Sequence, residues 1–436
     1  MKQILLFGAG KSATCLIDYL VQNAIAENWH ITIADINVAV IEAKTNGAVC
    51  TTALAVDIHN TEEREALIGR ADIVISLMPP ALHFLIAQSC VALSKNLLTA
   101  SYVDDQLKSL SNEIEKKGIL FLCEMGLDPG IDHMSAMKII HGIKQKGGTI
   151  SSFKSHCGGL VAPESDDNPW HYKISWNPRN VVTAGSTGSV YRVWEEVEQI
   201  SYKEVFTDCD EIEVDRIGSL AWYPNRDSLS YIPVYKLQEA ATFIRTTLRH
   251  PAFCRAWAVL VQMEITSDDD WDIIKNCKTV SDWFNKKISV AAGIDFEKDI
   301  QKEITKMFIW LGLFAENPLP ENKTSSAAIL QHIIEEKLVL QPHDKDMVVM
   351  VHEIDYAINN DEFKVVSSLV VKGENSLRTA MAKTVGLPLG IAAKLILNGT
   401  IQLTGLYIPI VKEIYEPVLA ELQLNGITFS EIEIPI

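Results

Sequence analysis

Six residues near the start of the chain have the types and spacing of a phosphate-binding loop. They form the GxGxxA pattern Gly8-Ala9-Gly10-Lys11-Ser12-Ala13, between an apolar run and an amphipathic stretch. The first glycine permits a tight turn, the second lets the backbone approach a pyrophosphate, and the small last residue lets a helix pack on a strand. The N–H groups at the helix start then face the phosphates. We therefore predict that a dinucleotide binds here, through Gly8, Gly10, Lys11, Ser12 and Ala13.

An acid at the end of the second predicted strand bears on which dinucleotide is bound. Asp35 can accept hydrogen bonds from a ribose 2′-hydroxyl and would repel a 2′-phosphate. Ile36-Asn37, which follow, supply no arginine for such a phosphate. We therefore expect NAD to be preferred over NADP. The alternative role for Asp35 is the N-cap of the next helix.

Alternating segments position these residues. Strand-like runs alternate with helix-length stretches through about the first 125 residues, as a doubly wound parallel sheet requires. The predicted strands are Gln3–Phe7, His30–Ala34, Ala48–Ala55, Ile73–Leu77, Leu97–Thr99 and Leu120–Cys123. The predicted helices are Lys11–Asn23, Asn37–Asn46, Thr61–Gly69, Leu82–Ser94 and Asp104–Lys117. Six strands with five crossovers make a complete Rossmann unit.

Two residues after the fourth predicted strand are further candidates for the cofactor site. Ser76 and Met78 lie at the carboxyl edge of the sheet, where ligands of open α/β sheets bind. They could line the nicotinamide ribose. Alternatively, Pro79-Pro80 simply terminates the strand.

Composition excludes several classes of protein. The net charge of −17 argues against nucleic-acid binding, which uses clustered Lys and Arg. We find no apolar stretch near the length of a membrane span and no metal-ligand pattern. The eight cysteines include no CxxC pair and are expected to be reduced thiols. With the early strand, this predicts a cytoplasmic protein that acts on a small molecule without a metal.

Several segments beyond the loop carry a more specific signal. They are Thr99–Val103, Glu124–His133, Cys157–Ser165 with Asn168-Pro169, Tyr172–Trp176, Tyr223–Asp227 and Thr247–Arg249. Together they closely resemble saccharopine reductase, the glutamate-forming saccharopine dehydrogenase. The Cys-Gly-Gly-Leu and Ala-Pro-Glu-Ser parts of Cys157–Ser165 are the most specific, because unrelated dehydrogenases share the dinucleotide loop.

The resemblance implies an α/β architecture with a Rossmann domain, a mixed α/β substrate domain and a helical insertion. We expect the Rossmann domain at residues 1–125, completed by about 395–436. The substrate domain would take 126–250 and 341–394, with the helical subdomain at 251–340. The implied reaction is reversible NAD(P)-dependent oxidation of the C–N bond of saccharopine, giving L-glutamate and 2-aminoadipate 6-semialdehyde in lysine metabolism. We expect a homodimer.

The resemblance also assigns roles that suit the substrate, which has three carboxylates and two nitrogens. Arg226 and Arg249 could each clamp a carboxylate, although an ion pair would explain either one. Ser101 and Tyr102 follow the fifth predicted strand and could donate hydrogen bonds to substrate. Tyr102 could instead be a rim aromatic with a solvated hydroxyl. We name Tyr102, Asp128 and Cys157 as catalytic candidates.

The acids and the cysteine are weighed separately. Asp128 is favoured for contact with the substrate or proton transfer, and Asp132 as an ordinary acid in the first turn of a helix. Cys157, expected at the end of a strand, resembles the family's active-site cysteine. Hydride transfer from a secondary amine needs no nucleophile, so positioning or proton relay fits Cys157 better. His156 and His171 have no identifiable catalytic partner.

The chain differs from the family pattern at two places, and two other functions are possible alternatives. Fungal members of the family have a Cys-Arg-Thr-like segment after the second strand and use NADP, whereas this chain has Asp35-Ile36-Asn37. Residues 180–188 are also smaller and richer in glycine than the usual apolar helix. The rivals are a carboxynorspermidine-type dehydrogenase, which lacks the Cys157–Ser165 pattern, and a catalytically silent NAD-binding sensor or scaffold.

Overall fold

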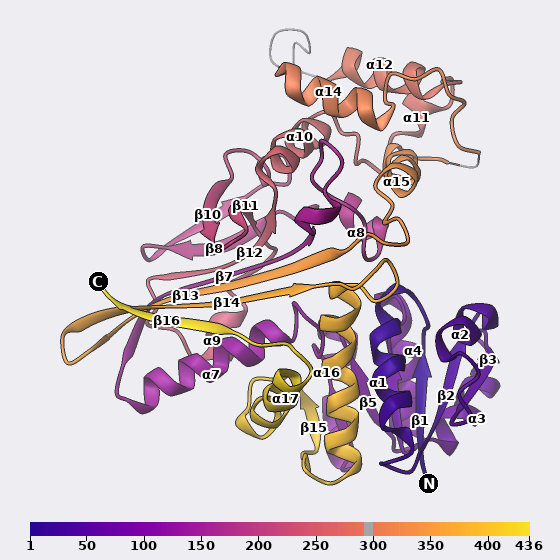
Figure 1. The fold of residues 1–436 in the computed structure, drawn as a ribbon, viewed down its shortest axis with the longest axis vertical. Coiled ribbons are helices and arrows are strands. Elements are labelled where there is room, and N and C mark those ends of the chain that lie inside the picture. The colour runs from indigo at the N-terminus through magenta and orange to yellow at the C-terminus, as the bar shows by residue number, and fades with distance from the viewer. Residues whose placement is uncertain (292–299, 322) are drawn as a thin grey trace. The chain divides into compact units, whose positions relative to one another are not determined.

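The chain folds into two compact units, neither of which is a single stretch of chain. The computed structural model describes residues 1–291, 300–321 and 323–436 (Figure 1). The first unit comprises residues 1–148 and 377–430, and the second comprises residues 149–376 and 431–436.

A seven-stranded parallel sheet forms the centre of the first unit, which confirms the predicted Rossmann-like domain. The strands, in sheet order, are β15 (Gly405–Tyr407), β6 (Leu120–Leu122), β5 (Asn96–Thr99), β4 (Ile73–Ser76), β1 (Lys2–Phe7), β2 (Trp29–Asp35) and β3 (Thr51–Ala55). Six of them match predicted strands. β3 starts later than predicted, because Ala48 accepts a hydrogen bond from Thr51 and closes a turn there. The seventh strand, β15, pairs with β6.

Helices surround this sheet. They are η1 (Lys11–Ala13), α1 (Thr14–Ala24), α2 (Val38–Thr45), α3 (Thr61–Arg70), α4 (Pro80–Ala92), α5 (Asp105–Ser109), α6 (Ser111–Lys116), α7 (Ile131–Gln145), α16 (Ala380–Leu397) and α17 (Lys412–Leu424). The predicted helix Asp104–Lys117 is interrupted between α5 and α6. Leu107 and Ile114, one from each, pack into the same core as Leu5 and Phe7 of β1.

The contact between α1 and α16 brings together segments from opposite ends of the chain (Figure 1). A methyl group on Gly386 would lie 2.8 Å from the backbone nitrogen of Leu16, and one on Gly390 would lie 2.6 Å from the ring of Tyr19. The two glycines therefore let the helices approach closely. This packing corrects our expected boundary, because residues 126–148 and 377–394 belong to the first unit and not to the substrate domain.

By length and composition α16 could cross a membrane, which corrects our statement that no apolar stretch is near that length. It has 18 residues with a mean hydropathy of 1.5, and 72% of it is buried in the protein. Burial against α1 accounts for its apolar character, as in the core helices of many proteins.

A nine-stranded mixed sheet forms the second unit. Its main path runs β10 (Asp210–Val214), β11 (Gly218–Pro224), β12 (Thr242–Arg249), β7 (Thr149–Val161), β13 (Asp346–Ile358), β14 (Asp361–Lys372) and β16 (Ser430–Pro435). β8 (Ser189–Val193) pairs with β12 and with β9 (Glu196–Ile200). β13 and β14 form an antiparallel hairpin. Its tip is Asn359-Asn360, both at positive φ, as a two-residue type I′ turn requires.

Helices cluster in the remainder of this unit. They are η2 (Pro163–Ser165), α8 (Pro178–Val182), α9 (Tyr231–Tyr235), α10 (Pro251–Gln262), α11 (Trp271–Ile274), α12 (Val280–Val290), α14 (Lys302–Leu311) and α15 (Ser326–Lys337). Most of the predicted helical segment 251–340 is described, but 292–299 and 322 lie outside the described residues. Trp170, Trp257 and Trp283 are fully buried in the core of this part.

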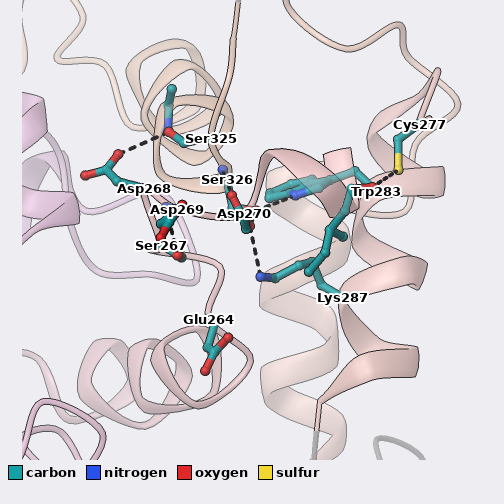
Figure 2. A network of polar contacts seen from close by, with 12 residues as sticks. Glu264, Ser267, Asp268, Asp269, Asp270, Cys277, Trp283, Lys287, Ser325 and Ser326 are labelled. Carbon is teal, nitrogen blue, oxygen red and sulfur yellow. Dashed lines mark hydrogen bonds and ion pairs between the residues drawn. The ribbon is translucent and has the colours of Figure 1, made fainter. Parts of the chain in front are cut away.

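A buried ion pair joins Lys287 of α12 to Asp270, which precedes α11 and also binds the start of α15 (Figure 2). Asp270 accepts hydrogen bonds from the Lys287 ammonium at 3.0 Å and from the Ser326 backbone at 2.9 Å, and also from the Ser326 hydroxyl. Trp283 donates to the same hydroxyl at 2.8 Å. Each buried polar group in this network therefore has a partner, which a buried charge requires.

The α1–α16 contact predicts the effect of adding a methyl group. Gly386→Ala should lower the free energy of unfolding by about 1–3 kcal/mol, because the methyl would overlap Leu16. Gly142→Ala in α7 is the matched control: that methyl meets no atom within 4 Å and should stabilise the helix by up to about 1 kcal/mol. Urea unfolding measures both, and equal stability of the two variants would contradict the close packing.

Candidate functional site

The glycine loop has the geometry predicted for it. Gly8 has a φ of 96°, and a methyl there would lie 2.8 Å from the carbonyl oxygen of Leu77. Gly10 has no protein atom within 4 Å of the corresponding position, so packing does not explain its lack of a side chain. Ala13 is fully buried where η1 meets α1. The loop thus leaves backbone accessible at Gly10, which suits a pyrophosphate.

Asp35 is bound to the glycine loop. Its carboxylate accepts hydrogen bonds from the backbone of Ala9 at 2.7 Å and of Asn37 at 3.1 Å. Asn37, not Asp35, caps α2, because its side chain accepts from Ala39 at 3.1 Å. The alternative role that we gave Asp35 is therefore wrong. Its oxygen atoms instead hold β2 and the loop together.

A histidine that sequence reasoning missed connects two predicted site residues. His83 of α4 lies 2.8 Å from the hydroxyl of Ser76 and 2.7 Å from the hydroxyl of Ser101 through its two ring nitrogens. Thr99 is a third, longer contact at 3.4 Å. Ser76 ends β4 and Ser101 follows β5, so this chain runs along the carboxyl edge of the sheet. Met78 is half-buried and packs against the core that contains Leu5 and Phe7. Pro79 is the N-cap of α4, which starts at Pro80.

Burial keeps the His83 imidazole neutral. It lowers the pKa of His83 from its ordinary value of 6.5 to about 4, and the negative charge of Asp104 opposes this shift. A neutral imidazole donates through one nitrogen and accepts through the other, so it can orient both serine hydroxyls. The sequence signal was a histidine within the otherwise apolar start of α4.

The structure brings together two of the catalytic candidates. The Tyr102 hydroxyl donates to the Asp128 carboxylate at 3.2 Å. Nearby, the buried Glu124 carboxylate accepts from the backbone of Val103 at 3.0 Å and contacts His133 at 2.8 Å. This buried pair ties the segment before Asp128 to α7 and to the segment after β5 that carries Tyr102.

Asp132 has the structural role expected of it. It lies in the first turn of α7, is buried, and accepts a hydrogen bond from the backbone of Gly130 at 2.6 Å. Its carboxylate also lies 3.5 Å from the His133 ring. An acid at this end of a helix is stabilised by the helix dipole.

Cys157 lies within β7 and not at a strand end, which corrects our expectation. It pairs with Thr247 of β12 on one side and Met350 of β13 on the other. The glycines after it do not end the strand, because Gly158 has no side chain and the backbone of β12 passes close to it. A methyl on Gly158 would lie 2.4 Å from the carbonyl oxygen of Leu248.

His156 is not a base for Cys157. Successive side chains of a strand point to opposite faces, so the two residues lie on different sides of the sheet. His156 contacts the Thr246 hydroxyl at 2.7 Å and Glu353 at 3.3 Å. This contact holds the pKa of Glu353 at about 2, well below its usual range. His171 likewise bonds Asp166, at 2.6 Å.

Arg249 is a buried cation at the end of β12. Its guanidinium donates to the carbonyl of Leu248 at 2.8 Å and lies 5.2 Å from the centre of the Tyr172 ring. Within the described part of the chain, no carboxylate lies at ion-pair distance from it, and its Nε atom has no hydrogen-bond partner. By contrast, the buried Lys173 contacts Asp167 and Asp344 at 2.9 and 2.7 Å.

This contrast makes Arg249 a strong anion-binding candidate, because a buried charge is costly unless it is paired. A contact with Gly159 at 3.5 Å places Arg249 beside the Cys157 segment. Arg226 differs from Arg249. It is exposed, follows β11 at a positive φ of 53°, and its carbonyl accepts from Val190.

Comparisons with known proteins agree with this fold. A family model described as the saccharopine dehydrogenase NADP binding domain matches residues 4–122, and one described as the saccharopine dehydrogenase C-terminal domain matches residues 126–427. The chain is 33% identical to a Saccharomyces cerevisiae protein named saccharopine dehydrogenase [NADP(+), L-glutamate-forming], over 97% of both chains. The apo structure of saccharopine dehydrogenase (L-Glu forming) from that yeast superimposes with a TM-score of 0.89 over 100% of both chains, at 31% identity.

A second group of relatives is longer. The bovine protein named alpha-aminoadipic semialdehyde synthase, mitochondrial, is 34% identical over 98% of this chain. That match covers 47% of the bovine protein, so this chain spans about half its length.

These findings overturn the expected preference for NAD. The family model for the first domain is an NADP binding domain, and relatives from three fungi have NADP(+) in their names. The structure shows why Asp35 misled us. Its carboxylate is engaged by backbone N–H groups of Ala9 and Asn37, so an acid at the end of β2 does not by itself indicate a ribose ligand.

The buried imidazole predicts a pH dependence of stability. The folded pKa of His83, about 4, lies below its unfolded value, so its contribution is present above pH 6.5 and is lost as the pH falls toward 4. The difference between these two pKa values corresponds to about 3 kcal/mol in the free energy of unfolding. His83→Gln should remove this part of the slope in urea unfolding between those pH values. His59→Gln, at an exposed position, is the control and should keep it.

Proposed function

Because this chain belongs to the saccharopine dehydrogenase family, we propose that it is an NADP(H)-dependent oxidoreductase that acts on saccharopine. In the oxidative direction, the carbon of the C–N bond on the aminoadipate side loses a hydride and the nitrogen loses a proton, which gives an imine. Water then adds to the resulting imine, whose hydrolysis yields L-glutamate and 2-aminoadipate 6-semialdehyde. The end-to-end match to the yeast enzyme is the observation that carries this proposal.

The residues of the first unit fit the cofactor. Gly8, Gly10 and the start of η1 and α1 would hold the pyrophosphate, since Gly10 has no protein atom where a side chain would begin. Ser76, oriented by His83, lies at the edge of the sheet where the nicotinamide ribose binds in this fold. When bound, NADP⁺ supplies the hydride acceptor, and the protein supplies binding, orientation and proton transfer.

Tyr102 and Asp128 are the proposed proton-transfer pair. The tyrosine hydroxyl donates to the carboxylate of Asp128, and a carboxylate is the type of group that can accept a proton from the substrate amine. Ser101, oriented by His83, is proposed to donate a hydrogen bond to the substrate. The buried Glu124–His133 contact keeps the segment that bears Asp128 in place.

Arg249 is proposed to bind a substrate carboxylate. It is a buried guanidinium without an acid at ion-pair distance among the described residues, so a ligand carboxylate would supply the missing charge. Arg226 could bind a second carboxylate from the loop after β11. Its exposure means that water competes with the ligand, so its effect should be smaller.

A steady-state assay with saccharopine tests the activity. Purified protein given saccharopine and NADP⁺ should produce NADPH, seen by its absorbance, together with L-glutamate. NAD⁺ in place of NADP⁺ should support slower turnover at the same concentration. Tight cofactor binding without turnover would instead support a binding protein, and turnover only with other amine–aldehyde conjugates would favour the carboxynorspermidine type.

Arg249 provides a prediction about substrate affinity. Arg249→Met nearly keeps the length of the side chain but removes its charge. It should weaken the binding of saccharopine by about 2–5 kcal/mol, the usual cost of removing one partner from a buried charge pair. NADPH binding should stay within about twofold of wild type. Arg255→Met, at an exposed position on α10, is the control. An unchanged KM for saccharopine in Arg249→Met would place Arg249 outside the site.

Cys157 provides a prediction about mechanism. Cys157→Ser and Cys157→Ala should both retain turnover within about tenfold of wild type, because the reaction requires no covalent intermediate at this sulfur. Circular dichroism should show both variants folded. Loss of activity by several orders of magnitude in both, with a substrate adduct on the wild-type thiol by mass spectrometry, would show instead that Cys157 is a nucleophile.

A further inference from the structure

Lys44 of α2 reaches back to the glycine loop. Its ammonium donates to the carbonyl oxygen of Ala9 at 2.8 Å and also to that of Gly10. The side chain is half-buried, although Lys44 lies near the end of α2 and far from the loop in sequence. The contact places a positive charge against the two residues whose backbone the dinucleotide would cross.

The surroundings of this ammonium leave its charge only partly compensated. Burial lowers the pKa of Lys44 to about 8, and the negative charge of Asp35 opposes that shift. Both of its hydrogen-bond acceptors are neutral carbonyls, and within the described residues no carboxylate lies at ion-pair distance from it. Asp35 itself is bound to Ala9, the same residue that Lys44 contacts.

We propose that Lys44 binds the 2′-phosphate of NADP(H) and is the specificity-determining cation of this chain. The inference rests on the proposed NADP(H) dependence. At the end of β2 the chain has Asp35-Ile36-Asn37, without an arginine, and Lys44 supplies the positive charge on that side of the loop. A lysine ammonium binds phosphate as a point charge, and here it also offsets the repulsion from Asp35.

The hydrogen bonds to Ala9 and Gly10 allow a different role, in which Lys44 only holds the loop. The two roles have different consequences. If Lys44 only holds the loop, its removal would weaken the binding of NADPH and NADH alike, because the pyrophosphate of both cofactors binds this loop. Loss of a phosphate contact would weaken NADPH alone, because NADH has a hydroxyl at the 2′ position.

Binding of NADPH and NADH to three variants distinguishes the roles, with affinity read from cofactor fluorescence. Lys44→Met should lower the affinity for NADPH by about 10- to 100-fold and the affinity for NADH by less than about threefold. Lys44→Arg should retain most of the affinity for NADPH, because it keeps the charge. Lys95→Met is the matched control. That half-buried lysine also donates to a backbone carbonyl, of Ala71 at 2.7 Å, and its loss should change neither affinity.

Proton uptake gives a second readout. A 2′-phosphate carries about two negative charges near pH 8.5 and would raise the proton affinity of Lys44. The groups that act on Lys44 are Asp35 of β2 and Cys15 and Asp18 of α1, and Asp18 is paired with Arg378 at 2.8 Å. Calorimetry in two buffers at about pH 8.5 should show proton uptake on binding of NADPH but not NADH, and none for Lys44→Met.

The outcomes separate this inference from the proposed function. Wild-type protein that prefers NADPH, with the preference unchanged in Lys44→Met, would overturn the role of Lys44 and leave the proposed function intact. Equal weakening of both cofactors in Lys44→Met would also overturn it, in favour of a structural role. Wild-type protein that binds NADH as tightly as NADPH would overturn the NADP(H) dependence and this inference with it.

Discussion

The close packing of α16 against α1 is the contact on which the first unit depends. Gly386 and Gly390 let the two helix backbones approach, and α16 also contacts η1, which forms the last part of the glycine loop. Interiors are packed as densely as organic crystals, so a displacement of α16 would be transmitted to α1 and the loop. A second close approach, of Gly158 to Leu248, has the same role in the mixed sheet, where it keeps β7 continuous through the Cys157 segment.

The sequence predicted local structure well where one pattern determined one element. Apolar runs located six of the seven parallel strands. Patterns said less about long-range contacts. The Cys157 segment was expected at a strand end, because two glycines usually disfavour a strand interior. The neighbouring backbone of β12 explains why Gly158 lies there. His83 was overlooked because its two serine partners are distant in sequence. Asp35 was misinterpreted because its hydrogen bonds to Ala9 and Asn37 cannot be read from sequence.

Buried cations have different partners at structural positions and at the proposed binding positions. Lys173 and Lys287 are buried with carboxylates at hydrogen-bond distance, which removes most of the cost of their burial. Arg249 and Lys44 donate to backbone carbonyls, which compensate a positive charge only in part. A site that must accept an anion benefits from such a cation, because a fully paired one would first have to lose its partner. His83 is the neutral counterpart, in which burial favours an uncharged hydrogen-bond relay.

The division of the chain between the units has a consequence for synthesis on the ribosome. The chain passes from one unit to the other at residues 148–149, 376–377 and 430–431. The first 148 residues therefore emerge long before α16, and the face of α1 that carries Leu16 and Tyr19 stays uncovered while the whole second unit is made. Exposed apolar surface on a nascent domain promotes aggregation and recruits chaperones. The first unit can therefore be completed only when residue 430 has been translated, so a product that terminates before α16 would lack a complete first unit.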